Sequence, residues 1–224
     1  MDIFAPFHEA HPFSPFVVGQ IGQSLDGRIA TLSGDAQNIG GAAGLDHLHR
    51  LRAEVDAVVV GAATVLADDP QLTVRRVNGA NPARVVIDPR GRIGGGGRWL
   101  NPDGARRILV TSAQTGPAGC DDIIALQTGI DGFSPSQIIG ELFQRGLRKI
   151  LIEGGAITLS RFLQAGCLDR LHVVVSPLII GAGKPSLELP PIERLSQAMR
   201  PATRIFLLGG GEVLFDCDMR EGQK

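Results

Sequence analysis

The chain is most constrained by a regular alternation of short apolar runs with segments of helical periodicity. Runs such as residues 57–60 are rich in β-branched side chains and have no polar face, which is typical of strands buried on both sides. Residues 45–55, in contrast, repeat apolar side chains every three or four positions, as an amphipathic helix does. Strands that alternate with helices are joined by crossovers and lie parallel to one another. The alternation therefore predicts an α/β fold with a mixed, mostly parallel central sheet flanked by helices.

The 224 residues lie within the range that α/β folds fill as one domain. We expect residues 1–14 to form an N-terminal extension and residues 15–224 to form a single domain. The runs 204–208 and 213–215 flank three consecutive glycines, which predicts a closing antiparallel hairpin. Further strands are expected at residues 16–21, 84–88, 108–111, 123–126, 149–152 and 171–175, and further helices at residues 62–67, 134–146 and 157–165.

One of these helices carries a full set of end signals. Ser134 is a candidate N-cap, Pro135 suits the first helical position, and Gln137 would complete a capping box. Gly146 is the expected stop.

Composition and charge argue against several classes of partner. The net charge is −1 and 20% of the residues are charged, so the chain has no basic excess for nucleic acid. No run approaches the ~20 apolar residues of a membrane span, and the first fifteen residues lack the pattern of a signal peptide. The three cysteines are widely spaced, which is typical of a reducing compartment. We expect a cytoplasmic protein that binds neither nucleic acid nor membrane.

The most informative local motif is Glu153-Gly154-Gly155, which stands between an expected strand and an expected helix. Two glycines allow the backbone to approach a phosphate, and the helix start offers free N–H groups and a positive dipole end. The same pattern also makes a tight strand-to-helix turn, and it is not the G-x-G-x-x-G fingerprint. Glu153 ends its strand, where α/β sheets usually place ligand contacts.

Two arginines are candidate phosphate ligands. The guanidinium groups of Arg52 and Arg75 would each fork onto a phosphate if they met in one cleft. An isolated arginine is more often a surface residue or an ion-pair partner. Thr64 and the pair Asp68-Asp69 before a proline likewise have both a ligand-binding and a purely structural interpretation. Such acidic pairs often mark only a turn.

No metal site is expected from the sequence. His47 and His49 are two positions apart on a helix and point in different directions, whereas chelating pairs are three or four apart. The zinc-deaminase pattern, the G-x-S-x-G elbow and the Walker loop do not occur. Cys167 fits a small core residue better than a nucleophile.

Five motifs in a fixed order carry a resemblance to a known family. Together they resemble the reductase domain of the bifunctional riboflavin-biosynthesis deaminase-reductase, in a stand-alone form that extends from about residue 15 to the C-terminus. The motifs are Ser24-Leu25-Asp26-Gly27-Arg28-Ile29-Ala30, Leu51-Arg52-Ala53, Val60-Gly61 to Thr64, residues 67–75 (ADDPQLTVR) and Ile152-Glu153-Gly154-Gly155, and residues 175–181 (VSPLIIG) resemble a later strand and loop of the family.

The resemblance implies a dihydrofolate-reductase-like fold, a homodimer and NADPH-dependent reduction of 5-amino-6-(5-phosphoribosylamino)uracil to the ribitylamino product. It implies that Glu153 orients the pyrimidine or the ribose hydroxyls, and that Arg52, Leu72 and Arg75 contact the phosphorylated substrate. The reaction requires close alignment of nicotinamide and substrate more than a strong acid or nucleophile. The residues implied to hold the cofactor are Gly22, Ser24, Thr64, Asp68, Gly155, Ala156, Ile157 and Thr158.

Three positions depart from the usual pattern of this family. Gln20 stands where a lysine is common, Ala36 where a substrate-contacting serine is common, and Asn38 where a tryptophan often covers the nicotinamide. Two alternatives therefore stay open. One is a reductase of the same fold that acts on another pyrimidine, a pterin or a flavin-related compound, and the other is a nucleotide-binding protein without catalysis.

A fourth departure bears on the choice of cofactor. Pro89 replaces a polar residue near the expected adenosine phosphate, while Arg90 and Arg92 would supply charge for a 2′-phosphate. We expect NADPH in preference to NADH.

Overall fold

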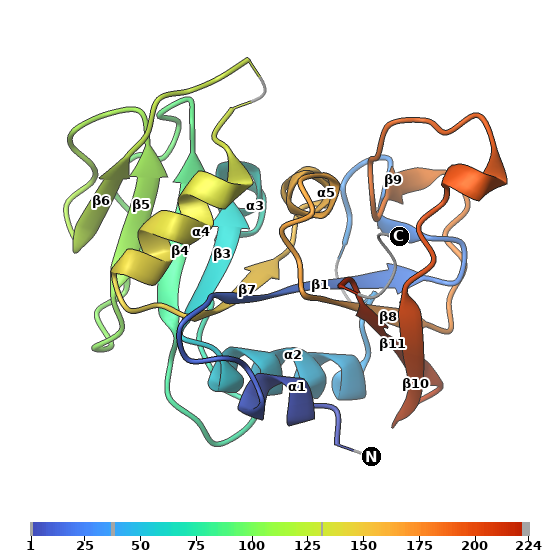
Figure 1. Ribbon diagram of the computed structural model, residues 1–224. Helices are drawn as coiled ribbons and strands as arrows, with labels where there is room; N and C mark the ends of the chain where they lie inside the picture. Colours follow the sequence, from blue (N-terminus) through green and yellow to red (C-terminus); the bar gives the residue numbers. More distant parts are fainter. Residues whose placement is uncertain (1, 37–38, 131, 221–224) are drawn as a thin grey trace.

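The computed structural model describes residues 2–36, 39–130 and 132–220, and one large sheet between two layers of helices forms its centre (Figure 1). The helices are α1 (Ala5–His8), α2 (Ala42–Glu54), α3 (Ala62–Asp68), α4 (Pro135–Gln144) and α5 (Ala156–Gln164), with 3-10 turns at Arg98–Leu100 and Leu195–Gln197. The strands are β1 (Phe16–Ser24), β2 (Arg28–Thr31), β3 (Ala57–Gly61), β4 (Ala83–Asp88), β5 (Arg107–Thr111), β6 (Asp122–Ala125), β7 (Lys149–Glu153), β8 (Arg170–Ser176), β9 (Gly183–Pro185), β10 (Ala202–Gly209) and β11 (Glu212–Asp218).

The order of the strands places the N-terminal strand near the middle of the sheet. Within the described residues the large sheet has nine strands in the order β10-β11-β8-β1-β7-β3-β4-β5-β6. The strands from β8 to β6 in this order run parallel, and β11 and β10 continue the sheet in antiparallel fashion. Strands β2 and β9 form a separate antiparallel pair. The predicted mostly parallel sheet with a C-terminal antiparallel hairpin is confirmed.

Both faces of the sheet are covered, which explains the apolar strand sequences. In β1, Val17 and Ile21 belong to the core on the side of α4 and α5, whereas Phe16 and Val18 belong to the core on the side of α1 and α2 (Figure 1). Successive side chains of a strand point to opposite faces, so a strand buried on both sides needs apolar residues at consecutive positions.

The N-terminal residues expected to form an extension pack against the domain. Helix α1 lies beside α2 on the same side of the sheet (Figure 1). Its Phe7 is fully buried, and its ring meets that of Phe16 edge to face with the centroids 5.1 Å apart. Phe7 therefore contributes to the core of the domain, with Phe4 and Ala10 packed beside it.

The start of α4 differs from its prediction. Pro135 occupies the first turn as expected, but the Ser134 hydroxyl lies 2.9 Å from the Ser136 hydroxyl and makes no capping bond to the backbone. The predicted capping box with Gln137 is therefore wrong. A neighbouring hydroxyl competes for the serine side chain, and spacing alone does not reveal this competition.

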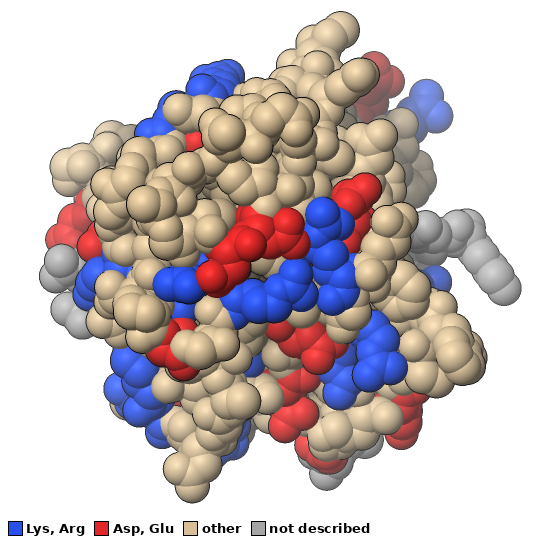
Figure 2. All heavy atoms as spheres, turned by 90° about the vertical axis from the view of Figure 1, so that its left-hand side faces the viewer, with Lys and Arg blue, Asp and Glu red and all other residues tan. Residues whose placement is uncertain are grey.

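The surface over the outer strands carries mixed charges. Basic and acidic side chains lie side by side on the face shown in Figure 2. At the start of the outer strands β5 and β6, Arg107 pairs with Asp121, and Asp122 pairs with both Arg106 and Arg145, the C-cap residue of α4. The electrostatic potentials of such close opposite charges largely cancel far from the surface. In the part of the chain that the structure describes, no helix is long and apolar enough to cross a membrane.

Candidate functional site

Two glycines begin helices at the carboxyl ends of the neighbouring strands β3 and β7. Gly61 precedes α3 and Gly155 precedes α5. A Cβ atom placed on Gly61 would lie 2.4 Å from Thr158 Oγ1, and one on Gly155 would lie 3.0 Å from Thr64 Oγ1. The fold therefore brings Thr64 of α3 beside Gly155 and Thr158, which lie about 90 residues further along the chain.

The backbone at this junction suits an anion. Gly154 and Gly155 have φ angles of 71° and 69°, a left-handed conformation that favours glycine. No side chain caps the following helix, so the first N–H groups, those of Ala156, Ile157 and Thr158, lie at an uncapped positive end. Such a helix start binds phosphate groups readily.

Asp68 lies on the same helix as Thr64. The two residues are four positions apart on α3 and therefore share one face of it. Asp68 is exposed, and its carbonyl accepts a hydrogen bond from Arg98 Nη2 at 3.3 Å. The predicted residues Thr64 and Asp68 thus stand one helical turn apart.

The Ser24 side chain takes part in a turn. Its buried hydroxyl donates to Asp26 Oδ1 at 2.6 Å and accepts from the backbone N–H of Arg28 at 2.9 Å. The Asp26 carboxylate in turn accepts the N–H groups of Ile180 and Gly181. These hydrogen bonds, that of Ser24 first, lower the pKa of Asp26 to about 2. The Ser24 hydroxyl therefore joins two loops through Asp26.

A pocket lies between β1 and α2. Its volume is about 190 Å³. It contains Gly22, which was predicted to contact the cofactor, and two of the unusual positions, Gln20 and Ala36; the third, Asn38, lies outside the described residues. The remaining lining residues are Ile29, Ile39, Gly40, Gly44, Leu45, Leu48 and Val174.

Arg52 and Glu153 form a buried ion pair beside this pocket. The Nε and Nη2 atoms of Arg52 donate to the two carboxylate oxygens of Glu153, at 2.8 and 2.5 Å, and Nη1 donates to the carbonyl of Thr73 at 2.9 Å. Arg52 is 5% exposed and Glu153 is 9% exposed. Burial lowers the pKa of Arg52, but the adjacent Glu153 charge raises it above its usual value. The fork of Arg52 therefore faces a protein carboxylate, and Glu153 is held in one orientation.

Arg75 is the exposed member of the arginine pair. Its Nη1 donates to the Thr73 hydroxyl at 2.7 Å, so Arg52 and Arg75 meet at the same residue. Burial, together with the charges of Arg52 and Arg98, lowers the pKa of Arg75. An exposed guanidinium near other cations is well placed to receive an anion.

Leu72 has an unusual backbone. Its φ of 58° is in the left-handed region, which a leucine rarely adopts, and its side chain is buried in the core. Its side chain therefore contributes to the core on the side of α1 and α2. Backbone strain of this kind often occurs at functional sites.

The sequence analysis missed the roles of His49 and Glu212. The Nδ1 atom of His49 accepts the backbone N–H of Arg75 at 2.9 Å, and burial and then the nearby arginines lower its pKa to about 4.

The buried Glu212 carboxylate accepts the N–H groups of Gly41 and Gly44, both at 2.8 Å, and so caps α2 from the C-terminal hairpin. It carried no local signal because 168 residues separate Glu212 from Gly44.

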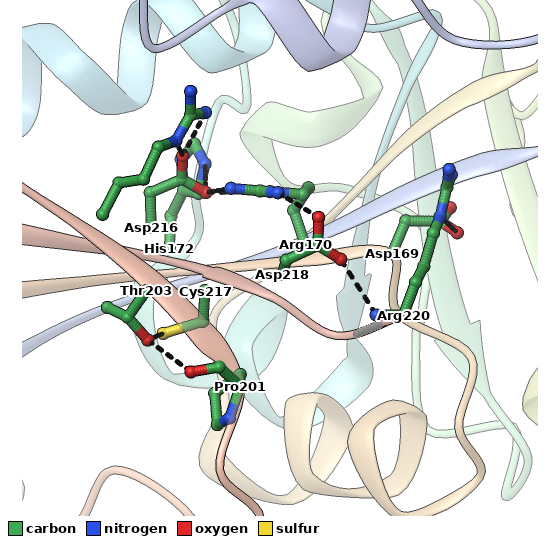
Figure 3. A network of polar contacts seen from close by, with 10 residues as sticks. Asp169, Arg170, His172, Pro201, Thr203, Asp216, Cys217, Asp218 and Arg220 are labelled. Atoms are coloured by element: carbon green, nitrogen blue, oxygen red, sulfur yellow. Dashed lines mark hydrogen bonds and ion pairs between the residues drawn. The ribbon is translucent and has the colours of Figure 1, made fainter. Parts of the chain in front are cut away.

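His47 belongs to a different network, which joins α2 to the C-terminal strands. Its Nε2 lies 3.1 Å from Nδ1 of His172, whose Nε2 lies 3.2 Å from Oδ1 of Asp216. Asp216 also pairs with Arg170 and Arg204 (Figure 3). Burial first, and then His172, lowers the pKa of His47 to about 3. The two histidines of α2 thus point to different partners, as their spacing predicted.

No group of three or more His, Cys, Asp or Glu side chains that could hold a metal ion occurs among residues 2–36, 39–130 and 132–220.

Comparisons with known proteins show which family the chain resembles. The family model described as the RibD C-terminal domain matches residues 15–214. A 2,5-diamino-6-ribosylamino-4(3H)-pyrimidinone 5′-phosphate reductase from Methanothermobacter thermautotrophicus is 34% identical over 174 residues, which cover 75% of this chain and 80% of that protein. The riboflavin biosynthesis protein RibD of Aquifex aeolicus is 34% identical over 171 residues, which cover 75% of this chain and 48% of that protein.

Solved structures show the same fold. A diaminohydroxyphosphoribosylaminopyrimidine deaminase/5-amino-6-(5-phosphoribosylamino)uracil reductase from Thermotoga maritima has a TM-score of 0.76 at 29% identity, over 92% of this chain and 56% of that one. Dihydrofolate reductase from Enterococcus faecalis has a TM-score of 0.52 at 12% identity, over 92% and 98% of the two chains, a likeness of fold alone. The chain spans about half the length of the RibD relatives it matches. The expected dihydrofolate-reductase-like fold is confirmed.

Proposed function

Because the chain belongs to the RibD C-terminal domain family, we propose that it is an NADPH-dependent reductase of 5-amino-6-(5-phosphoribosylamino)uracil in riboflavin biosynthesis. The observation that carries this proposal is the ion pair of Glu153 with Arg52. It stands between the glycine junction at Gly155 and the exposed guanidinium of Arg75, which supports a cofactor region and a phosphate region at one edge of the sheet.

The glycine junction fits a dinucleotide. A Cβ atom on Gly155 would fill the space beside Thr64, so the junction leaves room that another side chain would occupy. The N–H groups at the start of α5 would hold the pyrophosphate, with Thr64 and Thr158 beside it. Gly22 would leave room for the nicotinamide, which supplies the hydride when the cofactor is bound.

The phosphate region fits the sugar phosphate of the substrate. Arg75 would hold the phosphate through its free N–H groups, and the backbone of Leu72 would border the same space. Glu153, fixed by Arg52, would accept hydrogen bonds from ribose or pyrimidine groups. Catalysis then consists mainly of holding the sugar carbon against the hydride donor, because alignment of two bound reactants lowers the barrier by itself.

The finer features of the proposal rest on separate observations. Arg90 and Arg92 follow β4 and are exposed, which supports a 2′-phosphate and hence NADPH in preference to NADH. The three cysteines are free, which supports the reducing environment of the cytoplasm. Strand β10 ends the sheet and exposes apolar side chains, which supports a homodimer.

The decisive test is oxidation of NADPH by the purified chain. The assay should offer the deaminated substrate and, separately, the 2,5-diamino compound for which the archaeal relative is named, each with NADPH and with NADH. Turnover of the deaminated substrate with NADPH supports the proposal. Turnover only with another pyrimidine, a pterin or a flavin-related compound would identify a reductase of changed specificity. Cofactor binding without turnover on the whole panel would identify a binding protein.

A further inference from the structure

Gln20 is a buried amide in the central strand of the sheet. It is 6% exposed and lies on β1, two positions after Val18 and therefore on the same face, toward α2. It lines the pocket between β1 and α2. A polar side chain buried this deeply normally has hydrogen-bond partners.

The neighbours of Gln20 on both sides are already engaged. In the sheet register Gln20 stands beside Glu153 of β7 and His172 of β8. Both carboxylate oxygens of Glu153 accept hydrogen bonds from Arg52. Nδ1 of His172 is engaged by His47, and its Nε2 lies 3.2 Å from Oδ1 of Asp216. Nowhere in the described part of the chain does the Gln20 amide have a hydrogen-bond partner.

The walls of the pocket suit a flat, uncharged ring. Gln20 is its one polar side chain among the described lining residues, and none of them is charged. Gly22 carries no side chain, and a Cβ atom there would enter open space, so this position leaves the pocket wide. Aliphatic side chains form most of the rest of the wall. The aliphatic lining residues are Ile29, Ile39, Leu45, Leu48 and Val174.

We propose that Gln20 is a specificity-determining residue that hydrogen-bonds the neutral cyclic-amide edge of the substrate's pyrimidine ring. A carboxamide presents an acceptor oxygen and donor N–H groups in one plane, and a cyclic amide presents the complementary pair. The aliphatic walls cover the ring faces. The inference rests on the pyrimidine substrate of the proposed function and assigns the group that recognises its ring, apart from the phosphate.

The lining of the pocket favours a neutral ligand over a charged one. A carboxylate or phosphate in this pocket would lose its hydration and meet no cation among the described lining residues. A neutral ring loses less hydration on entering the pocket, and it offers a hydrogen-bond partner to an amide that lines the pocket and has none among the described residues. Sites that hydrogen-bond a ligand discriminate strongly against analogues that lack the bonding group, because the buried protein group is then left unpaired.

The test uses binding of the bare ring and a control on the same strand. Gln20→Met removes the amide but keeps an unbranched side chain of similar length, and Gln20→Leu is the second variant. Gln23→Leu makes the same exchange three residues later, on the opposite face of β1 and outside the pocket. NMR titration would measure the affinity for 5,6-diaminouracil, for its 1,3-dimethyl analogue and for NADPH, after a thermal melt has shown that each variant is folded.

We expect both Gln20 variants to weaken binding of 5,6-diaminouracil about tenfold, as for the loss of one net hydrogen bond. Gln23→Leu should leave it unchanged. The dimethyl analogue has no ring N–H donor and keeps only the carbonyl acceptors, so its affinity should depend less on Gln20 than that of 5,6-diaminouracil. Equal binding of 5,6-diaminouracil by folded Gln20 variants and wild type overturns the inference, and so does a loss confined to NADPH.

The result also separates this inference from the proposed reaction. Gln20-dependent binding of 5,6-diaminouracil in a protein that does not reduce the phosphorylated substrate supports ring recognition and rejects the reaction. Turnover with KM and ring affinity unchanged in both Gln20 variants supports the reaction and overturns the role of Gln20.

Discussion

At the scale of single residues, Arg52 and Arg76 show how burial changes the contribution of an ion pair to stability. Arg52 is buried with Glu153, whereas Arg76 pairs with Asp46 at 2.6 Å with both side chains about two-fifths exposed. Removing one partner of a buried pair leaves the other charge without compensation. The same removal at the surface leaves a charge that water solvates.

We therefore expect Arg52→Met to lower the free energy of unfolding by about 3–5 kcal/mol, and Arg76→Met to lower it by less than about 1 kcal/mol. Urea denaturation would measure both. The double variant Arg52→Met/Glu153→Leu should recover much of the loss, because it removes both buried charges. Equal losses for Arg52→Met and Arg76→Met would contradict the burial argument.

Arg75 and its neighbour Arg76 allow a test of substrate binding by enzyme kinetics. Arg75→Ala should raise KM for the phosphorylated substrate about tenfold or more, since a charge-assisted hydrogen bond to phosphate is worth about 1.5–3 kcal/mol. The adjacent Arg76→Ala removes the same charge from the chain and should leave KM nearly unchanged. Steady-state assays at saturating NADPH measure the difference. An unchanged KM for Arg75→Ala would remove Arg75 from the phosphate region.

His47 predicts how stability depends on pH. Its pKa is about 3 in the folded protein against 6.5 for an ordinary histidine, so the unfolded chain binds a proton that the folded protein excludes. This contribution to stability is fully present above pH 6.5 and is lost as the pH falls toward 3, by about 1.4 kcal/mol per pH unit. The charges acting on His47 include those of His172, Arg50 and Asp216.

Between pH 6 and 4, the free energy of unfolding of His47→Phe should therefore fall less steeply with falling pH than that of the wild type. The difference in slope corresponds to about one bound proton. Urea titrations at several pH values would measure the slopes. Identical slopes would mean that His47 is protonated in the folded state.

At the scale of elements, Glu212 shows how the C-terminal hairpin holds α2. No side chain near the start of this helix caps it, and the carboxylate from β11 takes that place. Ser176 of β8 donates to the same carboxylate at 3.0 Å. A Cβ on Gly41 or Gly44 would lie 2.8 or 2.7 Å from the Glu212 oxygens, so these glycines allow the close approach.

Glu212→Ala should lower the free energy of unfolding by about 1–3 kcal/mol, because two N–H groups and a hydroxyl lose their acceptor. Amide hydrogen exchange at Gly41 and Gly44 should accelerate, which a general loss of packing elsewhere would not produce selectively. Glu193→Ala, at an exposed glutamate, is the control. Unchanged exchange at Gly41 and Gly44 would show that Glu212 does not cap α2.

At the scale of the whole molecule, the edge formed by β10 bears on assembly. Ile205 and Leu207 are 62% and 84% exposed on a strand that pairs on one side only. An apolar unpaired edge is a liability for a monomer, and two-fold pairing with a second copy would cover it.

We expect sedimentation velocity to show a dimer for the wild type. The double variant Ile205→Lys/Leu207→Lys should shift it toward monomer, because like charges would meet at the shared edge. Ile130→Lys, at an exposed isoleucine outside that strand, should not. A wild type that stays monomeric at every concentration would reject the dimer, and a dimer insensitive to the double variant would move its interface elsewhere.

The sequence determined the elements and the order in which they follow one another. Burial determines the pattern of apolar side chains within each segment. Residues 57–60 and 149–152 could therefore be identified as strands without knowledge of their neighbours. The Glu153-Gly154-Gly155 motif was equally local, since the turn and the helix start lie within it. The capping box at Ser134 was wrong because its outcome depended on a competition between two nearby hydroxyls.

Tertiary structure alone decided which polar groups meet. Arg52 finds Glu153 across 101 residues because the register of the sheet and the packing of α2 bring them together. The same packing engages the Ser24 hydroxyl in a turn and leaves the Gln20 amide without a partner among the described residues. Hydrogen bonds and ion pairs depend on distances of a few ångströms between segments remote in sequence, and local periodicity contains no information about those distances.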